Sequence, residues 1–279
     1  MSLCLKKTRS TSHRLFDDAY EVILADTEAS RAIHRKIRYH VYCLERRFED
    51  HIAFASGEES DRWDTHAAQF IVRQRASGQW IAAMRLILPH AASFPLETLH
   101  CLTPNHAHQS NRRKLAEISR LCVIRLPDPH TVNPHLSREF GHVAGSRESQ
   151  ILLGLVRTII IYGLEWGIEH CYLLVTTPFA RLLRRLGIVL HQAGTATQHR
   201  GLRIPYLMGL RETGVSLCAR SVELNALFAR AKLAYRPFSA LDEEDFVLMP
   251  RFLPLLSQSS PTATRPYSYL YQPLPDLLA

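Results

Sequence analysis

Three groups of charged residues stand inside or beside apolar segments of this sequence, where a charge needs a partner. The first is the segment 61–66 (DRWDTH), the second is Arg85 within AAMRLIL, and the third is the segment 117–120 (EISR). A carboxylate can act as a general base, and an arginine can bind a carboxylate through two parallel hydrogen bonds. These residue types would suit proton transfer from an amine. They could instead form a structural network of ion pairs, and the residues alone leave both interpretations open.

The third group opens a predicted strand over residues 116–124 (AEISRLCVI). Side chains alternate between the two faces of a strand. Glu117 and Ser119 are therefore expected on one face and Arg120 on the other, unless a β-bulge interrupts the alternation.

Histidine and cysteine residues are frequent but form no metal-binding pattern. The chain has 15 His and 6 Cys, yet it contains no HExxH, no CxxC and no Cys/His pairing at zinc spacing. We therefore predict no metal site. The dispersed cysteines indicate a reduced, intracellular protein, and no secretory signal opens the sequence. We predict a cytoplasmic protein whose contact with a membrane is at most peripheral.

The chain carries a formal net charge of +8, from 34 Lys and Arg residues and 26 Asp and Glu residues. A basic surface favours an acidic partner. The basic residues form only short clusters, whereas a nucleic-acid-binding tail has a long basic run. Nucleic acid is therefore not favoured as the partner.

The elements expected to position the charged groups alternate in type. Thr27 is a predicted N-cap and Pro178 a predicted first-turn residue. Helices are predicted at 27–44, 147–167, 177–187 and 217–234, and strands at 67–73, 80–88, 116–124, 171–176, 188–193 and 204–210, the first two as a hairpin. The expected apolar stripe of the second helix includes Trp166. This order predicts an α/β domain with a mixed sheet.

The motifs, taken together, resemble acyltransferases of the GNAT superfamily. The series Arg38-xxx-Tyr42, Asp61-xx-Asp64, Arg85 and Glu117-xx-Arg120 is similar to acyl-homoserine-lactone synthases. The similarity is closer to N-acyl amino acid synthases and to acyltransferases associated with exosortase (PEP-CTERM) systems, because of Val41, Cys43, Glu45, Glu49 and Asp64-x-His66. The resemblance covers about residues 20–210.

The resemblance implies a GNAT-type α/β (α+β) fold, with a mixed, mostly antiparallel central sheet flanked by helices. The expected domain spans residues 16–214. A flexible basic arm, residues 1–15, would precede it. A C-terminal helix and a tail rich in Pro, Ser and Tyr, residues 215–279, would follow it.

The implied reaction transfers a fatty acyl group from a thioester directly to the amine of an amino acid or a similar small molecule. No tightly bound cofactor is expected. Residues 138–145 (REFGHVAG) lack the Q/R-x-x-G-x-G/A loop that holds the pyrophosphate of coenzyme A in many relatives. Acyl carrier protein is acidic, which suits the basic chain. Both points favour acyl-4'-phosphopantetheine on acyl carrier protein, rather than acyl-CoA, as donor.

The resemblance also implies roles for individual residues. Glu117 would be the general base, with Arg120 beside it in the catalytic group. The acceptor pocket would be ordered by Arg38, Tyr42, Asp61, Asp64, His66 and Arg85. Acyl-pantetheine would be bound by Leu121, Cys122, Val123, Ile124, Gly145 and Ser146, through backbone N–H groups and a helix N-terminus. Leu183 stands where many members of the superfamily have a tyrosine acid.

Three alternatives remain at this point. Glu117 could be a structural partner of Arg85 or Arg120, with water as the base. The protein could be a CoA-dependent N-acetyltransferase. It could also be a non-catalytic GNAT-like protein that binds a lipid, a carrier protein or RNA.

Overall fold

The computed structural model describes residues 16–107, 111–125, 147–242 and 245, and its central feature is a nine-stranded sheet. The strands follow the order β6-β8-β5-β4-β3-β2-β1-β9, and β7 pairs with β8. In the described part, β4–β5 and β1–β9 are parallel and the other pairs are antiparallel. The strands are Tyr20–Leu24 (β1), Ala67–Gln74 (β2), Trp80–Ile87 (β3), Leu115–Val123 (β4), His170–Val175 (β5), His191–Gln192 (β6), Thr197–Gln198 (β7), Leu202–Gly209 (β8) and Arg236–Pro237 (β9). The predicted mixed, mostly antiparallel sheet is confirmed.

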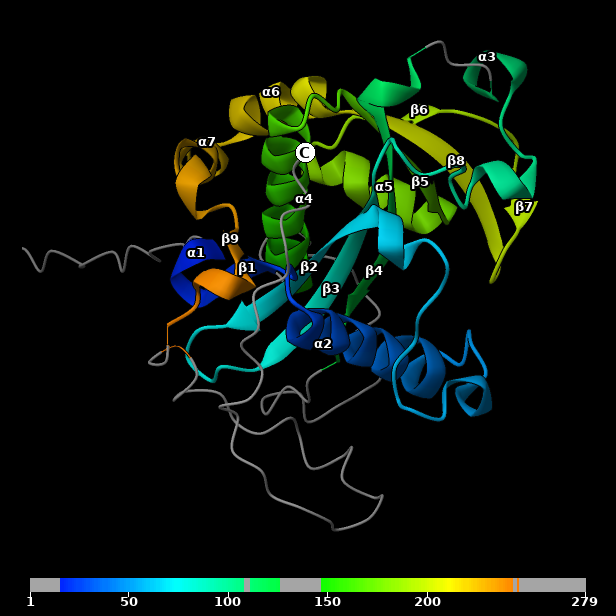
Figure 1. Ribbon diagram of the computed structural model, residues 1–279. Coiled ribbons are helices and arrows are strands. Elements are labelled where there is room, and N and C mark those ends of the chain that lie inside the picture. The colour runs from blue at the N-terminus through cyan, green and yellow to red at the C-terminus, as the bar shows by residue number, and fades with distance from the viewer. Residues whose placement is uncertain (1–15, 108–110, 126–146, 243–244, 246–279) are drawn as a thin grey trace, which may run out of the picture.

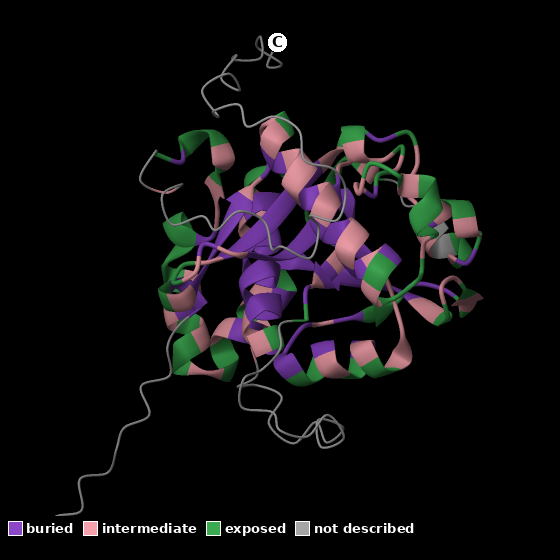
Figure 2. Ribbon diagram, turned by 90° about the horizontal axis from the view of Figure 1, so that it is seen from below, coloured by how far each residue is buried: buried purple, intermediate pink, exposed green. Residues whose placement is uncertain are grey.

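Helices cover both faces of this sheet (Figure 1). On one face lies α2 (Glu28–Tyr39), followed directly by a π-helical turn (His40–Glu45). On the other face lie α4 (Arg147–Glu165) and α5 (Thr177–Leu186). The other described helices are α1 (Phe16–Ala19), α3 (Pro104–Ala107), α6 (Leu210–Arg220), α7 (Val222–Ala229) and the 3-10 turns His51–Phe54, Asp64–His66, Glu97–Leu99, Arg112–Lys114, Ala231–Leu233 and Phe238–Ala240. The central strands are buried between the two helical layers (Figure 2).

Helix α2 begins where the sequence predicts. The Thr27 hydroxyl accepts a hydrogen bond from the Ser30 amide at 3.3 Å, and the Ser30 hydroxyl accepts one from the Thr27 amide at 3.0 Å. This reciprocal capping satisfies two N–H groups that the first turn leaves free. The α-helix ends at Tyr39, five residues before the predicted end, because the chain widens there into the π-helical turn. Such turns shift the phase of the side chains that follow and often occur at functional sites.

The parallel strands β4 and β5 are paired only over the first part of β4. Their register runs from Leu115 opposite His170 to Ile118 opposite Leu173. Strand β4 continues to Val123 without β5, whereas β5 stays paired with β8 as far as Val175. The two strands therefore diverge in the middle of the sheet. Beyond Ile118, the backbone groups of β4 on that side have no strand partner in the described part.

The segment that follows the sheet differs from its prediction. A single helix is predicted over 217–234, but α6 already begins at Leu210 and ends at Arg220, and α7 begins at Val222. The break falls at Ser221, whose hydroxyl accepts a hydrogen bond from the Leu224 amide at 3.1 Å. Serine favours this N-cap position over a helix interior, so it starts a new helix.

Two further local predictions are wrong. The strand predicted over 188–193 is reduced to the two residues of β6. Trp166, predicted to face the core, follows the last residue of α4 and is 57% exposed. The chain leaves the helix there and turns through Gly167, which has a φ of 72°, so the ring no longer follows the apolar stripe.

A buried arginine of α4 joins the N-terminal and C-terminal ends of the described chain. Arg157 is fully buried, and its guanidinium donates to both carboxylate oxygens of Asp17, at 2.9 and 2.5 Å. It also donates to the carbonyls of Leu227 and Leu233, at 2.9 and 3.1 Å. We call these contacts the Arg157 clamp. It fixes α1, α7 and the segment after α7 against α4.

Three findings concern the described residues alone. No helix among them is long and apolar enough to cross a membrane. They contain no group of three or more His, Cys, Asp or Glu side chains placed to hold a metal ion. The five cysteines in these ranges are all free.

Candidate functional site

A network of three arginines and three carboxylates lies on the α2 face of the sheet, and we call it the ion network. Its members come from α2, β3, β4 and the segment before β2: Arg38, Glu59, Asp61, Asp64, Arg85 and Arg120. Arg38 and Arg85 are fully buried, and Glu59 is 1% exposed. Charges this deep in a protein are stable only when they are paired and hydrogen-bonded. The three positive and three negative charges satisfy that condition.

Arg85 is the centre of the ion network. Its Nη1 lies 2.5 Å from Asp61 Oδ1 and 2.6 Å from Asp64 Oδ1, and its Nη2 lies 3.0 Å from Asp61 Oδ2. Its Nε donates to the Ser119 hydroxyl at 3.0 Å. Four hydrogen bonds thus hold the guanidinium flat against β4. Arg85 and Ser119 are also direct neighbours in the β3–β4 register.

Arg38 and Arg120 extend the ion network on either side of the two aspartates. Arg38 Nε lies 2.5 Å from Glu59 Oε2, and its Nη1 lies 2.6 Å from Asp64 Oδ1. Arg120 Nη2 lies 2.9 Å from Glu59 Oε1 and 3.0 Å from Asp61 Oδ2. Each carboxylate therefore bridges two arginines. Glu59 was not singled out in the sequence, where Glu58 beside it has the same side chain but pairs with Arg35 near the surface.

The two aspartates are held as anions. Burial alone would raise the pKa of Asp64, but Arg38 and Arg85 outweigh it and hold the pKa well below its usual range. Burial likewise opposes ionisation of Asp61, and Arg85 and Arg120 lower its pKa nonetheless. Both groups are therefore poor general bases, because their lowered pKa values disfavour the uptake of a proton.

A β-bulge in β4 places Arg120 on the same face as Glu117 and Ser119. The register passes from Ala83 opposite Cys122 to Arg85 opposite Ser119, so β4 has one extra residue at this point. Arg120 has a φ of 53°, in the left-handed region. The predicted opposite orientation of Arg120 is therefore wrong. The extra residue of the bulge cancels the alternation of side chains.

Glu117 lies apart from the ion network. It is 3% exposed, and its Oε2 accepts a hydrogen bond from the Leu96 amide at 2.9 Å. No arginine or lysine of the described chain lies within ion-pair distance of its carboxylate. Burial among apolar side chains raises the pKa of Glu117 to about 8, although the Leu96 hydrogen bond and Arg85 oppose the rise. The alternative that Glu117 is an ion-pair partner of Arg85 or Arg120 is therefore not supported.

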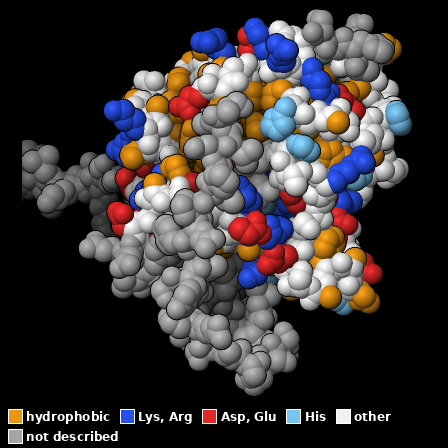
Figure 3. All heavy atoms as spheres, viewed as in Figure 1, with side chains coloured by type: hydrophobic (Ala, Val, Ile, Leu, Met, Phe, Trp, Pro, Cys, Tyr) orange, Lys and Arg blue, Asp and Glu red, His pale blue; other side chains and the backbone are white. Residues whose placement is uncertain are grey.

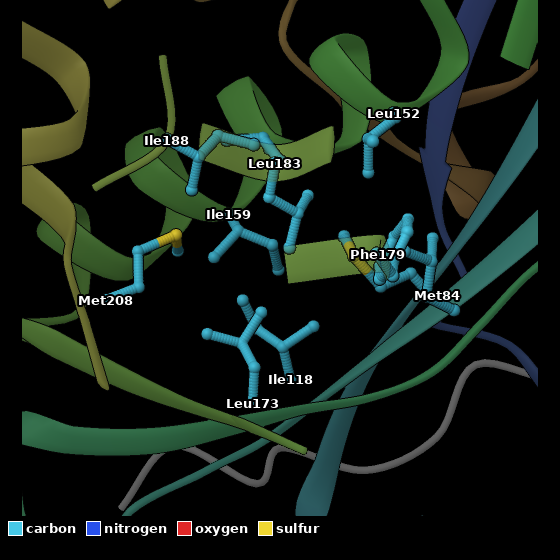
Figure 4. A pocket seen from close by; sticks show the side chains of 11 residues that line it. Met84, Ile118, Leu152, Ile159, Leu173, Phe179, Leu183, Ile188 and Met208 are labelled. Carbon is cyan, nitrogen blue, oxygen red and sulfur yellow. The ribbon is translucent and has the colours of Figure 1, made fainter. Parts of the chain in front are cut away.

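The opposite face of the sheet carries a small apolar cavity at the point where β4 and β5 diverge. It measures about 20 Å³, which is room for one water-sized group. Figure 4 shows its side chains converging from β3, β4, β5, β8, α4 and α5. The lining residues are Met84, Ile118, Leu121, Leu152, Val156, Ile159, Leu173, Phe179, Leu183, Ile188 and Met208. Leu183, at the position of the superfamily's tyrosine, therefore adds only apolar surface.

Of the remaining predicted site residues, some lie at the ion network and others do not. The Tyr42 hydroxyl donates to the Leu121 carbonyl at 3.0 Å, and Arg120 lies over its ring at 5.6 Å, so Tyr42 joins the site. His66 is exposed and packs against His90, outside the ion network. The Ile124 amide already donates to the Ile81 carbonyl at 2.8 Å. Gly145 and Ser146 lie outside the described residues.

The Leu121–Ile124 segment also shows which backbone donor remains. Successive amides of a strand point to opposite neighbours. Because the Ile124 amide points to β3, the Val123 amide points to the side from which β5 has diverged. The Cys122 thiol is buried, and burial raises its pKa to about 12, so it is not a thiolate at neutral pH.

Comparison with known proteins finds one family model that matches part of this chain. Residues 37–126 match the family described as acetyltransferase (GNAT) domain. All six members of the ion network and Glu117 lie within this range. This part of the chain is therefore similar to a GNAT acetyltransferase domain. No curated protein matches the sequence.

Three solved structures are similar to this chain. The AHL synthase LasI matches with a TM-score of 0.50 at 16% identity, over 71% of this chain and 94% of its own. This likeness confirms the predicted fold. BjaI, a CoA-dependent acyl-homoserine lactone synthase solved with SAM and isopentyl-CoA, has a TM-score of 0.48 at 14% identity, over 82% and 98% of the two chains. FeeM, an N-acyl amino acid synthase from uncultured soil microbes, has a TM-score of 0.46 at 16% identity, over 71% and 94%.

Proposed function

We propose that this GNAT domain transfers a fatty acyl group from a carrier-protein thioester to the amine of an amino acid. One observation carries the proposal: a polar site with Glu117 and an apolar cavity lie on opposite faces of β4, at the point where β4 leaves β5. A thioester placed in this divergence has its acyl chain on the α4–α5 face. Its carbonyl then lies within reach of an amine on the α2 face.

The apolar cavity is the proposed start of the acyl-chain site. Its present volume of about 20 Å³ holds no more than one water-sized group, so a fatty chain must displace lining side chains. Met84 and Met208 are unbranched and adapt easily to a new shape. The cavity lining is apolar throughout, which suits a hydrocarbon chain rather than an acetyl group alone.

Glu117 is the proposed general base. Its pKa of about 8 lies close to neutral pH. At such a pKa, part of the Glu117 population is ionised, and the carboxylate is still basic enough to take up a proton. Glu117 takes a proton from the ammonium or amine of the acceptor, directly or through a water. The amine nitrogen then forms a bond to the thioester carbon. The C–S bond breaks, the nitrogen gives up its second proton, and the departing pantetheine thiolate takes up that proton, directly or through a water.

Backbone N–H groups of β4 are the proposed oxyanion donors. The Val123 amide is the best candidate, since it points to the side that β5 has vacated. A fixed donor at this place stabilises the negative charge that develops on the carbonyl oxygen. The ion network holds β4 in its bulged form and so keeps this donor in place.

Acyl carrier protein is the proposed donor. The chain has a net charge of +8, and carrier proteins are acidic, so association is favoured by long-range attraction. On the face shown in Figure 3, basic side chains are dispersed among acidic and apolar ones. Such a distribution fits a protein partner better than the continuous phosphate backbone of a nucleic acid.

Lipid analysis of expressing cells tests the reaction. Extracts from cells that produce the wild type, Glu117→Gln and the exposed-residue control Glu148→Gln are compared by mass spectrometry. We expect new N-acylated amino acids with the wild type and the control. Loss of Glu117 as a base lowers the rate by a factor on the order of 10² to 10⁴. Near-normal product from Glu117→Gln would remove its assignment as the base.

Purified protein separates the donors. With acyl carrier protein thioesters we expect kcat/KM to rise with pH and to level off above about pH 8, because the base form of Glu117 accumulates there. Faster turnover of acetyl-CoA than of any acyl carrier thioester would instead establish a CoA-dependent N-acetyltransferase. Salt-sensitive RNA binding without acyl transfer would establish a binding protein.

A further inference from the structure

The arginines of the ion network are not available to bind an acidic substrate. Arg38 and Arg85 each contact two carboxylates of the protein itself, and Arg120 contacts three. A substrate carboxylate would have to displace one of these partners and leave it buried without a counter-charge, which costs several kcal/mol. If the acceptor has a carboxylate, another cation must receive it.

Strand β8 provides such a cation on the same face of the sheet. Ile204 and Tyr206 pack into the core beneath α4 and α5. Because side chains alternate along a strand, Arg203 points to the α2 face. Leu207, which shares its orientation, contributes to the apolar cluster that also contains Leu96, next to Glu117.

Arg203 lies across the β4–β5 divergence from Arg120. Its Nη1 is 3.5 Å from the carbonyl of Leu174, in the part of β5 that β4 no longer accompanies. Its guanidinium lies 5.9 Å from the centre of the Phe48 ring. Phe48 in turn packs against Tyr42, with ring centres 6.2 Å apart. Arg203 therefore borders the same space as the Tyr42 end of the site.

Arg203 has no carboxylate partner among the described residues. Its Nε is buried and forms no hydrogen bond there, and no acidic group of that part of the chain lies within ion-pair distance of it. With Nη1 directed at Leu174, the Nε–Nη2 edge remains. This edge presents two parallel N–H groups, the geometry that binds a carboxylate with two hydrogen bonds.

Two neighbours contribute to this position: Arg200 brings a second guanidinium, and His199, whose pKa is lowered by burial and by Arg203, contributes a neutral ring. Arg200, with a φ of 50°, pairs with Glu49 and donates to His199 Nε2 at 3.2 Å. Glu49 Oε1 also lies 3.8 Å from Arg120, so it joins this group to the ion network. Burial lowers the pKa of Arg203 and of Arg200, and their mutual proximity lowers that of Arg200 further. An anion placed between them would relieve both effects.

We propose that Arg203, supported by Arg200 and His199, binds the carboxylate of the acceptor, so that the acceptor is an α-amino acid rather than a simple amine. The inference rests on the proposed function. The phosphate of the donor is the competing ligand of the same charge. The α2-face orientation of Arg203, opposite the apolar cavity, favours the acceptor.

Paired ligands test the inference. The twenty L-amino acids and their carboxamides, which keep the amine and side chain but lack the carboxylate, are titrated calorimetrically into the wild type, Arg203→Gln, Arg203→Lys and the exposed control Arg181→Gln. Titrations are run with and without holo acyl carrier protein. We expect at least one amino acid to bind the wild type at least about tenfold more tightly than its carboxamide, the loss expected for a bidentate charged contact.

Arg203→Gln should abolish that preference, Arg203→Lys should retain part of it, and Arg181→Gln should retain all of it. Equal binding of amino acids and carboxamides by the wild type, no binding of any amino acid, or an undiminished preference in Arg203→Gln would overturn the inference. So would a rise confined to the KM of the carrier thioester, which would assign Arg203 to the donor phosphate.

The experiments distinguish a failure of the proposed function from a failure of the proposed Arg203 site. Absence of acyl transfer in the wild type, together with carboxylate-dependent binding that requires Arg203, would remove the proposed function and leave the site. Acyl transfer to amines and amino acids alike would leave the function and remove the site. Thermal unfolding of each variant shows whether it is folded.

Discussion

The raised pKa of Glu117 favours its proposed role as a general base, but it lowers the free energy of unfolding at alkaline pH. Its ordinary pKa is 4.5 and burial raises it to about 8 in the folded protein. Between these values the folded state holds a proton that the unfolded state releases, so the free energy of unfolding falls as the pH rises through that interval. Gln at this position stays neutral, and its amide oxygen can still accept the Leu96 hydrogen bond.

Glu117→Gln is therefore expected to be more stable than the wild type at alkaline pH. The difference should be small near pH 5 and grow to a few kcal/mol by about pH 8, then level off. Urea denaturation at a series of pH values measures it, with Glu148→Gln as an exposed control that should stay within about 0.5 kcal/mol throughout. A difference that does not change with pH would contradict the raised pKa.

At this scale, the sequence predicted the residue types of the site better than their partners. Arg38, Arg85, Asp61 and Asp64 stand out because charges in apolar surroundings require an explanation. Glu59 does not stand out, because Glu58 and Glu59 are chemically alike and only the fold decides which of them faces the core.

The geometry of the site depends on the β-bulge in β4. It places Arg120 beside Asp61, and it requires a positive φ at that residue. Asparagine tolerates this conformation far better than a β-branched residue does. Arg120→Asn and Arg120→Val both lose the ion pairs, so a comparison of the two isolates the backbone.

We expect Arg120→Val to be less stable than Arg120→Asn by about 1–2 kcal/mol. Equilibrium urea denaturation of the two variants measures the difference. Equal stabilities would mean that β4 can return to a regular strand once the guanidinium is removed.

Helix α5 gives a second prediction at this scale, since Leu183 lines the apolar cavity. Leu183→Ala should shift the product distribution towards longer acyl chains, and Leu183→Phe towards shorter ones. The expected preference between chains that differ by one methylene changes by about 1–3 kcal/mol. Mass spectrometry of products from a mixture of acyl carrier thioesters measures it. An unchanged distribution in both variants would place the acyl chain elsewhere.

Elements were predictable from the sequence where local signals agree. The capped start of α2, the β2–β3 hairpin and Pro178 at the start of α5 all follow from local rules. The divergence of β4 from β5 and the bulge in β4 depend on contacts between distant strands. The alternation of apolar and polar residues along a strand predicts neither the divergence nor the bulge.

At the scale of the whole molecule, the Arg157 clamp joins the N-terminal and C-terminal ends of the described chain. Arg157→Met leaves the buried Asp17 carboxylate without its counter-charge, and this should destabilise the fold by about 3–5 kcal/mol. The double variant Asp17→Asn/Arg157→Met removes both charges and should recover part of the loss. Urea denaturation compares the two with Arg181→Met, an exposed substitution that should change stability by less than about 0.5 kcal/mol. If the double variant is less stable than Arg157→Met, Asp17 stabilises the fold through contacts other than Arg157.

The overall architecture could be predicted from the order of helices and strands, because a mixed sheet covered on both faces is the stable way to bury these apolar segments. The packing of the segment after α6 against α4 could not be predicted from the sequence. It depends on backbone carbonyls, such as those of Leu227 and Leu233, and every residue has a carbonyl.

The Arg157 clamp also sets when folding can finish during protein synthesis. The ribosome releases the chain from the N-terminus, so Asp17 and Arg157 emerge long before Leu233 does. Until that carbonyl is available, the guanidinium lacks one of its acceptors and its burial is incomplete. A nascent chain that ends near residue 210, with every strand but β9 synthesised, would expose the surface that α6 and α7 later cover. Such an intermediate is the species that chaperones would be expected to bind.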